Sequence, residues 1–103
     1  MTQEEFLIKT DNVQARVMHL GAGEATRWHY HTEVTDHMVC LSGQIVVRLR
    51  QPAESLVLSP GERCRVDPLR VHQVANPSPA DPASYLLLQG VGRYDFNMVE
   101  GDG

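Results

Sequence analysis

Residues 27–37, RWHYHTEVTDH, contain three of the five histidines of this 103-residue chain. Successive side chains of an extended strand point to opposite faces, so His29 and His31 share one face while Trp28 and Tyr30 share the other. Two imidazoles spaced in this way can converge on one metal ion. For Trp28 and Tyr30 the sequence predicts ordinary packing and no chemical role.

A metal site of this kind needs further ligands from elsewhere in the chain. His72, in the strand-like segment RVHQVAN, is the best candidate for a third imidazole. The carboxylate candidates are Asp36 and Glu33, and Glu33 continues the odd-numbered alternation of His29 and His31. Imidazoles with one carboxylate and an open position suit a first-row divalent ion that still binds water or substrate, whereas closed structural sites favour cysteine.

The spacing of these residues resembles the two sequence motifs of the cupin family, which read here Gly23-x5-His29-x-His31-x4-Asp36-x6-Gly43 and Gly61-x10-His72-x3-Asn76. The resemblance implies a metal site formed by His29, His31, Asp36 and His72, and it favours Asp36 over Glu33. It implies one divalent ion, with iron, manganese, zinc and nickel as the candidates.

The sequence departs from the family pattern in two places. Asp36 stands where the family normally has a glutamate. The shorter side chain could shift the metal, change its identity, or leave the carboxylate in contact with the ligands but not with the metal itself. The turn before His72 reads Asp67-Pro68-Leu69 where the family has Pro-x-Gly. Because leucine does not adopt a positive φ cheaply, we expect this turn to have a different shape.

The rest of the chain reads as short strands, because proline and glycine recur at short intervals and the apolar residues between them show no helical spacing. Eight strands are expected, over residues 13–20, 25–31, 37–41, 44–50, 56–58, 63–66, 71–75 and 84–89. Such strands must bury their apolar faces against each other, as a sandwich or a closed barrel. The resemblance implies an all-β fold, a single antiparallel jelly-roll β-barrel.

Local signals predict the connections between these strands. Ser42-Gly43 indicates a tight hairpin turn between the strands on either side of it, with a positive φ at the glycine. Ser59-Pro60-Gly61 favours a type II turn. Residues 76–82 hold three prolines and are expected to form a loop. Residues 3–9 are the only segment that could form a short helical turn.

Length and composition indicate one domain over residues 1–103, with a short lead at 1–12 and a frayed tail at 97–103. Hydrophobic residues make up 42% and charged residues 21% of the chain, which is ordinary globular usage. The two cysteines, Cys40 and Cys64, match no metal or disulfide pattern and are expected to be buried, reduced thiols.

The charge pattern limits the partners. A net charge of -4 without a basic run argues against nucleic acid or an anionic membrane as the main partner. No apolar stretch approaches the roughly 20 residues that span a bilayer. The first residues do not resemble a secretory signal, so we expect a cytoplasmic location.

Three residues are candidates for contact with a small-molecule ligand or substrate. Arg27 shares the histidine face by alternation and Arg70 shares that of His72, so either guanidinium could hold a carboxylate. Met38 shares the alternation of Asp36 and is expected to line the barrel interior, as are Cys40, Val74 and either Leu86 or Leu88.

Two functions from different classes remain open at this point. The first is a small metalloenzyme, in which the ion polarises a carbonyl or hydroxyl group of a small polar or carboxylated molecule, or activates dioxygen. The resemblance implies dioxygenase, isomerase, lyase or decarboxylase chemistry without choosing among them. The second is a non-enzymatic module that binds a small ligand. The resemblance also implies a homodimer, with residues 13–20 as a contact strand.

Overall fold

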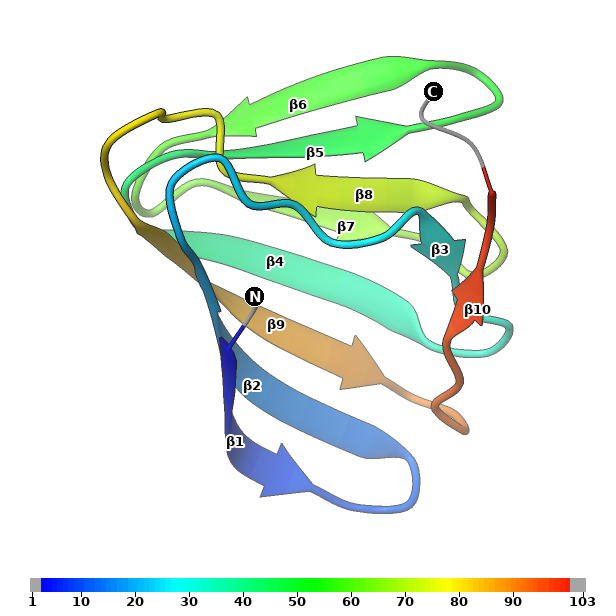
Figure 1. Cartoon of the computed structure of the whole chain (residues 1–103). Coiled ribbons are helices and arrows are strands. Elements are labelled where there is room, and N and C mark those ends of the chain that lie inside the picture. The colour runs from blue at the N-terminus through cyan, green and yellow to red at the C-terminus, as the bar shows by residue number, and fades with distance from the viewer. Residues whose placement is uncertain (1–2, 101–103) are drawn as a thin grey trace.

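The computed structural model describes residues 3–100, which form two antiparallel sheets of five strands each and no helix (Figure 1). One sheet has the strand order β1-β2-β9-β4-β7 and the other β10-β3-β8-β5-β6. The strands are β1 (Gln3–Lys9), β2 (Val13–Leu20), β3 (His29–Tyr30), β4 (Thr35–Ser42), β5 (Ile45–Leu49), β6 (Glu54–Leu58), β7 (Arg63–Val66), β8 (His72–Ala75), β9 (Ala83–Gly90) and β10 (Asn97–Met98). The predicted all-β jelly-roll fold is confirmed.

The core lies between the two sheets, and alternation along each strand decides which side chains enter it. In β4, Asp36, Met38 and Cys40 are buried while His37 between them is exposed. The core side chains are Met18, Leu20, Met38, Cys40, Ile45, Val47, Leu49, Leu58, Val66, Val74, Ala83, Tyr85 and Leu87. Each large apolar side chain buried here contributes roughly 1.5–3 kcal/mol.

The face that β9 turns to the core was predicted wrongly. Tyr85, Leu87 and Gln89 point inward, whereas Leu88 is 39% exposed and Leu86 is only partly buried. Three consecutive leucines show no alternation of polar and apolar residues, so nothing in this segment indicates which of them face the core.

The two ends of the described chain are more ordered than the sequence suggests. The predicted helical turn at residues 3–9 is wrong, because this segment forms β1 and pairs antiparallel with β2. Within the predicted frayed tail, Asn97 and Met98 form β10 and pair with Tyr30 and His29 of β3; residues 101–103 lie outside the described residues. Of the strand predicted at 25–31, only His29–Tyr30 forms one.

The hairpin predicted at Ser42-Gly43 is also wrong, because β4 and β5 do not pair with each other. β4 pairs with β7 and β9, whereas β5 pairs with β6 and β8, so the turn carries the chain from one sheet to the other. Gly43 has the expected positive φ of 69°. A Cβ there would lie 2.6 Å from the carbonyl oxygen of Pro82, which favours glycine at this crossing.

The turn at Ser59-Pro60-Gly61 behaves as predicted. Glu62 N donates to Ser59 O at 2.9 Å and Gly61 has a φ of 88°, as a type II turn requires. The loop at residues 76–82 is confirmed as well.

Both cysteines are free thiols. Cys40 is buried and Cys64 is half-buried, and burial raises the pKa of Cys64 to about 11. Both therefore remain protonated at neutral pH and are poor nucleophiles.

Residues 3–100 include no helix that is long and apolar enough to span a membrane.

Candidate metal centre

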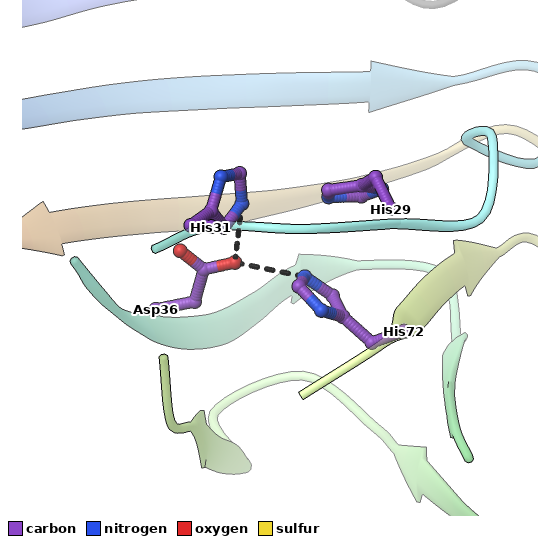
Figure 2. Close-up of side chains that lie close together, drawn as sticks. All are labelled: His29, His31, Asp36 and His72. Atoms are coloured by element: carbon purple, nitrogen blue, oxygen red, sulfur yellow. Dashed lines mark hydrogen bonds and ion pairs between the residues drawn. The ribbon is translucent and has the colours of Figure 1, made fainter. Parts of the chain in front are cut away.

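Four buried side chains meet between the two sheets (Figure 2). His29 belongs to β3, and His31 is the first residue after that strand. Asp36 lies in β4 of the opposite sheet, and His72 is the first residue of β8. His29 and His72 are direct partners across the β3–β8 pair. One ligand atom from each of the four side chains lies within 4.8 Å of the others, which is close enough for all of them to reach one ion.

Main-chain carbonyl groups orient the three imidazoles. The Nδ1 atoms of His29, His31 and His72 lie 2.6, 2.5 and 2.8 Å from the carbonyl oxygens of Arg27, Asp95 and Arg70, respectively. A carbonyl oxygen can only accept a hydrogen bond, so each Nδ1 carries the proton. The lone pair of each Nε2 is then free for a metal ion, the arrangement found in metal-ligating histidines.

The donor set fits a divalent cation. Asp36 Oδ2 lies 3.0 Å from His72 Nε2 and 3.3 Å from His31 Nε2. With both Nδ1 atoms protonated, these Nε2 atoms present lone pairs to a carboxylate oxygen, and that contact is repulsive unless a proton or a cation lies between them. A metal ion held by the three Nε2 atoms and Asp36 would satisfy every one of these acceptors.

The electrostatics of the cluster favour positive charge at His31, beside Asp36, and disfavour it at His29. Burial disfavours ionised Asp36, but the hydrogen bonds that His31 and His72 donate from Nε2 when they are doubly protonated outweigh it and hold the pKa of Asp36 well below its usual range. Burial likewise disfavours charged His31, yet its hydrogen bond to Asp36 and the carboxylate charge raise the pKa of His31. Burial, followed by repulsion from His72, lowers the pKa of His29 to about 4.

The rival ligands lie elsewhere. Glu33 is exposed, and its carboxylate accepts a hydrogen bond from the backbone N–H of Arg93 at 3.1 Å. Asp36 is therefore the carboxylate that the fold brings to the imidazoles. His19 and His37 are exposed on the outer faces of β2 and β4.

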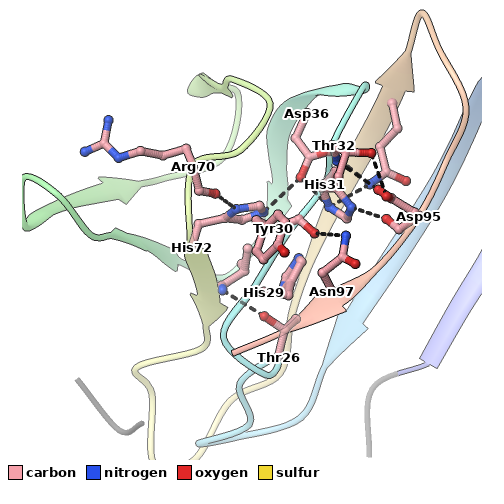
Figure 3. A network of polar contacts seen from close by, with 12 residues as sticks. Thr26, His29, Tyr30, His31, Thr32, Asp36, Arg70, His72, Asp95 and Asn97 are labelled. Atoms are coloured by element: carbon pink, nitrogen blue, oxygen red, sulfur yellow. Dashed lines mark hydrogen bonds and ion pairs between the residues drawn. The ribbon is translucent and has the colours of Figure 1, made fainter. Parts of the chain in front are cut away.

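Residues 94–97, the closing segment, lie against the cluster (Figure 3). The Phe96 ring stacks on His29 at 4.3 Å, and the Tyr94 ring lies 5.4 Å from that of His31. The Asp95 carboxylate accepts hydrogen bonds from Thr32 N at 2.8 Å and Thr32 Oγ1 at 2.6 Å, which fixes the carbonyl group that holds His31. These residues belong to no sequence motif, and two aromatic residues within a polar segment are their only signal in the sequence.

A pocket of about 550 Å³ opens beside the cluster, and His29 and His31 form part of its wall. Of the three predicted ligand contacts, only Arg27 lines it. Met38 lies in the core. The Arg70 side chain points away from the histidines (Figure 3). It donates hydrogen bonds to the carbonyl oxygens of Arg50 at 2.7 Å and Pro52 at 2.8 Å, and to the carboxylate of Glu54 at 2.9 Å.

Gln89 supports Asp36 and was not identified from the sequence, because a single polar residue in an apolar strand carries no motif. Its Nε2 donates to Asp36 Oδ1 at 2.9 Å, and its Oε1 accepts a hydrogen bond from Arg16. Arg16 in turn forms an ion pair with Glu4 at 2.7 Å. Gln89 therefore fixes the orientation of the Asp36 carboxylate, so that Oδ2 faces the imidazoles.

Replacing Gln89 with leucine should weaken zinc binding roughly tenfold, because the carboxylate loses the partner that orients it. The same change should lower the free energy of unfolding by about 2 kcal/mol, since both Asp36 and Arg16 lose a buried partner. Zinc titration and urea denaturation measure the two effects. Gln73→Leu is the control, because Gln73 also makes two hydrogen bonds but neither involves Asp36. Equal zinc affinity in both variants would contradict the supporting role.

The turn before His72 departs from the sequence expectation. Leu69 adopts a φ of 69°, the conformation that glycine takes easily and that leucine was expected to avoid. Leu69 N donates to His31 O at 2.7 Å, and this bond ties the turn to the metal cluster. The contact explains why the strained conformation persists.

Leu69→Gly should raise the free energy of unfolding by about 0.5–1 kcal/mol, because relief of the left-handed backbone outweighs the added chain entropy of glycine. The Leu69 side chain is 66% exposed, so little buried surface is lost. Urea denaturation measures the change. Leu41→Gly, at an exposed strand position, should instead be destabilising; a loss of stability of similar size in both variants would contradict the prediction.

The fold and the site together define a jelly-roll protein with a cluster of three histidines and one carboxylate. The model of the family described as "Cupin domain" matches residues 16–89, and the chain therefore belongs to this family. No curated protein matches the chain in sequence.

Solved structures of low sequence identity share the fold. The polyketide cyclase RemF from Streptomyces resistomycificus is 18% identical with a TM-score of 0.82, over 98% of this chain and 72% of RemF. An uncharacterized conserved protein with a double-stranded β-helix domain from Klebsiella pneumoniae is 20% identical with a TM-score of 0.80, over 97% of this chain and 85% of that one. A structure of oxalate oxidase with the substrate analogue glycolate is 15% identical with a TM-score of 0.80, and the match covers 96% of this chain but 54% of the oxidase.

Proposed function

We propose that this protein is a small metal-dependent enzyme that acts on a small polar or carboxylated molecule in the pocket beside His29 and His31. The observation that carries the proposal is the convergence of three Nε2 lone pairs and one carboxylate, with two of the imidazoles, His29 and His31, in the wall of that pocket. The ion would be iron, manganese, zinc or nickel, since all four accept imidazole and carboxylate ligands. The cupin neighbours include enzymes, which supports a catalytic role.

The residues have distinct parts in this function. His29, His31, His72 and Asp36 would hold the ion, which when bound supplies a positive centre that polarises a ligand oxygen. Asp36 also reduces the net positive charge of the loaded site. Phe96 and Tyr94 cover the imidazoles and restrict the access of water to them. The reaction belongs to the dioxygenase, isomerase, lyase or decarboxylase type.

Metal content and turnover test the proposal. The purified protein should contain one divalent ion per chain, and a panel of small carboxylates, sugars and hydroxy acids should be assayed with each of the four metals, in air and without oxygen. Turnover that requires iron and oxygen indicates a dioxygenase, and turnover without oxygen indicates an isomerase, lyase or decarboxylase. A protein that loses thermal stability on chelation but turns over no substrate is instead a binding module. Absence of metal binding would contradict both.

We also propose that the chain acts as one domain and as a homodimer in the cytoplasm. The contact strand expected at Val13–Leu20 is β2, which lies inside its sheet between β1 and β9. β1 is an edge strand of this sheet, and Leu7 and Ile8 are exposed on it outside the pocket lining, so the contact is better assigned to these residues of β1. Sedimentation equilibrium of the Leu7→Lys variant tests this: a monomer supports the assignment, and an unchanged dimer contradicts it.

A further inference from the structure

Arg16 of β2 is the most buried cation in the pocket wall, with 7% of its surface exposed. Its guanidinium lies between two aromatic rings, with Cζ 5.4 Å from the ring centres of both Phe6 and Tyr94. Nη2 donates to Gln89 and Nη1 pairs with Glu4. Nε has no hydrogen-bond partner within residues 3–100. A buried guanidinium requires a counter-ion, and among residues 3–100 Glu4 is the residue that forms an ion pair with Arg16.

Glu4 differs from Arg16 in exposure and setting. Its side chain is 43% exposed and belongs to β1, which pairs with one neighbour only and whose residues are all exposed. Glu4 nevertheless lines the same pocket as Arg16. The pocket therefore already contains one carboxylate, that of Glu4, paired with its buried arginine. Because the Glu4 side chain is 43% exposed, its carboxylate can leave Arg16 and enter solvent at little cost in free energy.

The charges of the pocket wall favour an anion. Lys9, Arg16 and Arg27 line it, and Glu4 is the one acidic residue among its lining residues. Once Glu4 leaves Arg16, the wall presents three cations to an incoming ligand. A pocket lined by charge of one sign raises the local concentration of ligands of the opposite sign.

We propose that Arg16 anchors the carboxylate group of the pocket ligand, and that Glu4 occupies this anchor until the ligand replaces it. This inference rests on the proposed function, since it takes the pocket beside His29 and His31 as the ligand site. Exchange of one carboxylate for another leaves Arg16 paired in both states. A ligand held at Arg16 lies in the same pocket as the two imidazoles, so its other end can reach the metal cluster. The ligand class is a small organic acid.

Matched pairs of probes and variants test the anchor. Lactate with lactamide and benzoate with benzamide are titrated by NMR into the metal-free and the zinc-loaded protein. The carboxylates should bind and the amides should not. Glu4→Gln should bind the carboxylates about tenfold more tightly, because the competing group is neutral, and Arg16→Gln at least about tenfold more weakly. Glu5→Gln is the control, since it removes the same charge from the neighbouring position outside the pocket lining.

The results separate this inference from the proposed function. Equal affinities of Glu4→Gln and Glu5→Gln, or equal affinities for acid and amide, would overturn the anchor. If Arg16→Gln does not fold, the comparison of Glu4→Gln with Glu5→Gln decides alone. A protein that binds zinc without preferring carboxylates refutes the anchor only. A protein that binds no metal refutes the proposed function, while titration of its metal-free form still decides the anchor.

Discussion

The His72→Ala variant should bind zinc at least roughly 100-fold more weakly than the wild-type protein, because one of the four side chains that can contact the ion is lost. His72 is almost completely buried, and no other histidine of residues 3–100 lies where it could replace it. Competition with a chromophoric chelator measures the affinity, and circular dichroism confirms the fold. His72→Gln provides a second variant of similar size, which leaves a smaller cavity.

His37→Ala is the matched control for this experiment. His37 lies next to Asp36 in sequence but on the exposed face of β4, so its removal should leave zinc binding unchanged. Wild-type affinity in His72→Ala, or an equal loss in both variants, would contradict the assignment of the metal centre.

The metal-free protein should be most stable near pH 6.5. His29 has a pKa of about 4 in the folded state against 6.5 in the unfolded state, so the unfolded chain binds the proton more tightly. This difference in pKa corresponds to about 3 kcal/mol of stability, which is lost as the pH falls from 6.5 to about 4. The raised pKa of His31 has the opposite sign: its contribution is fully present below pH 6.5 and is lost as the pH rises through the folded value. The lowered pKa of Asp36 adds stability that is lost only under more acidic conditions.

Urea denaturation in the presence of a chelator, between pH 4 and pH 8, measures this profile. His29→Gln should lose the part of the decline at acidic pH that His29 causes. Subtracting the free energies of unfolding of the two proteins at each pH removes the contribution of the carboxylates, which both proteins share. A wild-type decline below pH 6.5 equal to that of His29→Gln would contradict the prediction. Bound zinc should stabilise less as the pH falls, since protons compete with it for the imidazoles.

The sequence predicted the three imidazoles because their positions follow from local alternation and from family spacing. It left the carboxylate open, and the structure shows why. Strand β3 ends at Tyr30, so the alternation that pointed to Glu33 no longer applies beyond His31. Asp36 reaches the cluster from β4 in the opposite sheet, and only the motif spacing indicated it.

The features that the sequence did not reveal depend on contacts between distant segments. Turn signals at Gly43 are the same for a hairpin and for a crossing between sheets, and only the pairing of β4 with β7 and β9 distinguishes them. β1 and β10 are strands because they find partners. The Arg16–Gln89–Asp36 connection joins three strands through single polar residues, none of which has a sequence signature.

The closing segment around Asp95 is translated after all four candidate ligands. The ligands from His29 to His72 leave the ribosome early, but the carbonyl that orients His31 and the aromatic ring that stacks on His29 arrive more than 20 residues after His72. A nascent chain that ends before Tyr94 would hold all four ligands without their cover. A metal ion that binds in this final environment would therefore bind late, after translation of nearly all of the described chain.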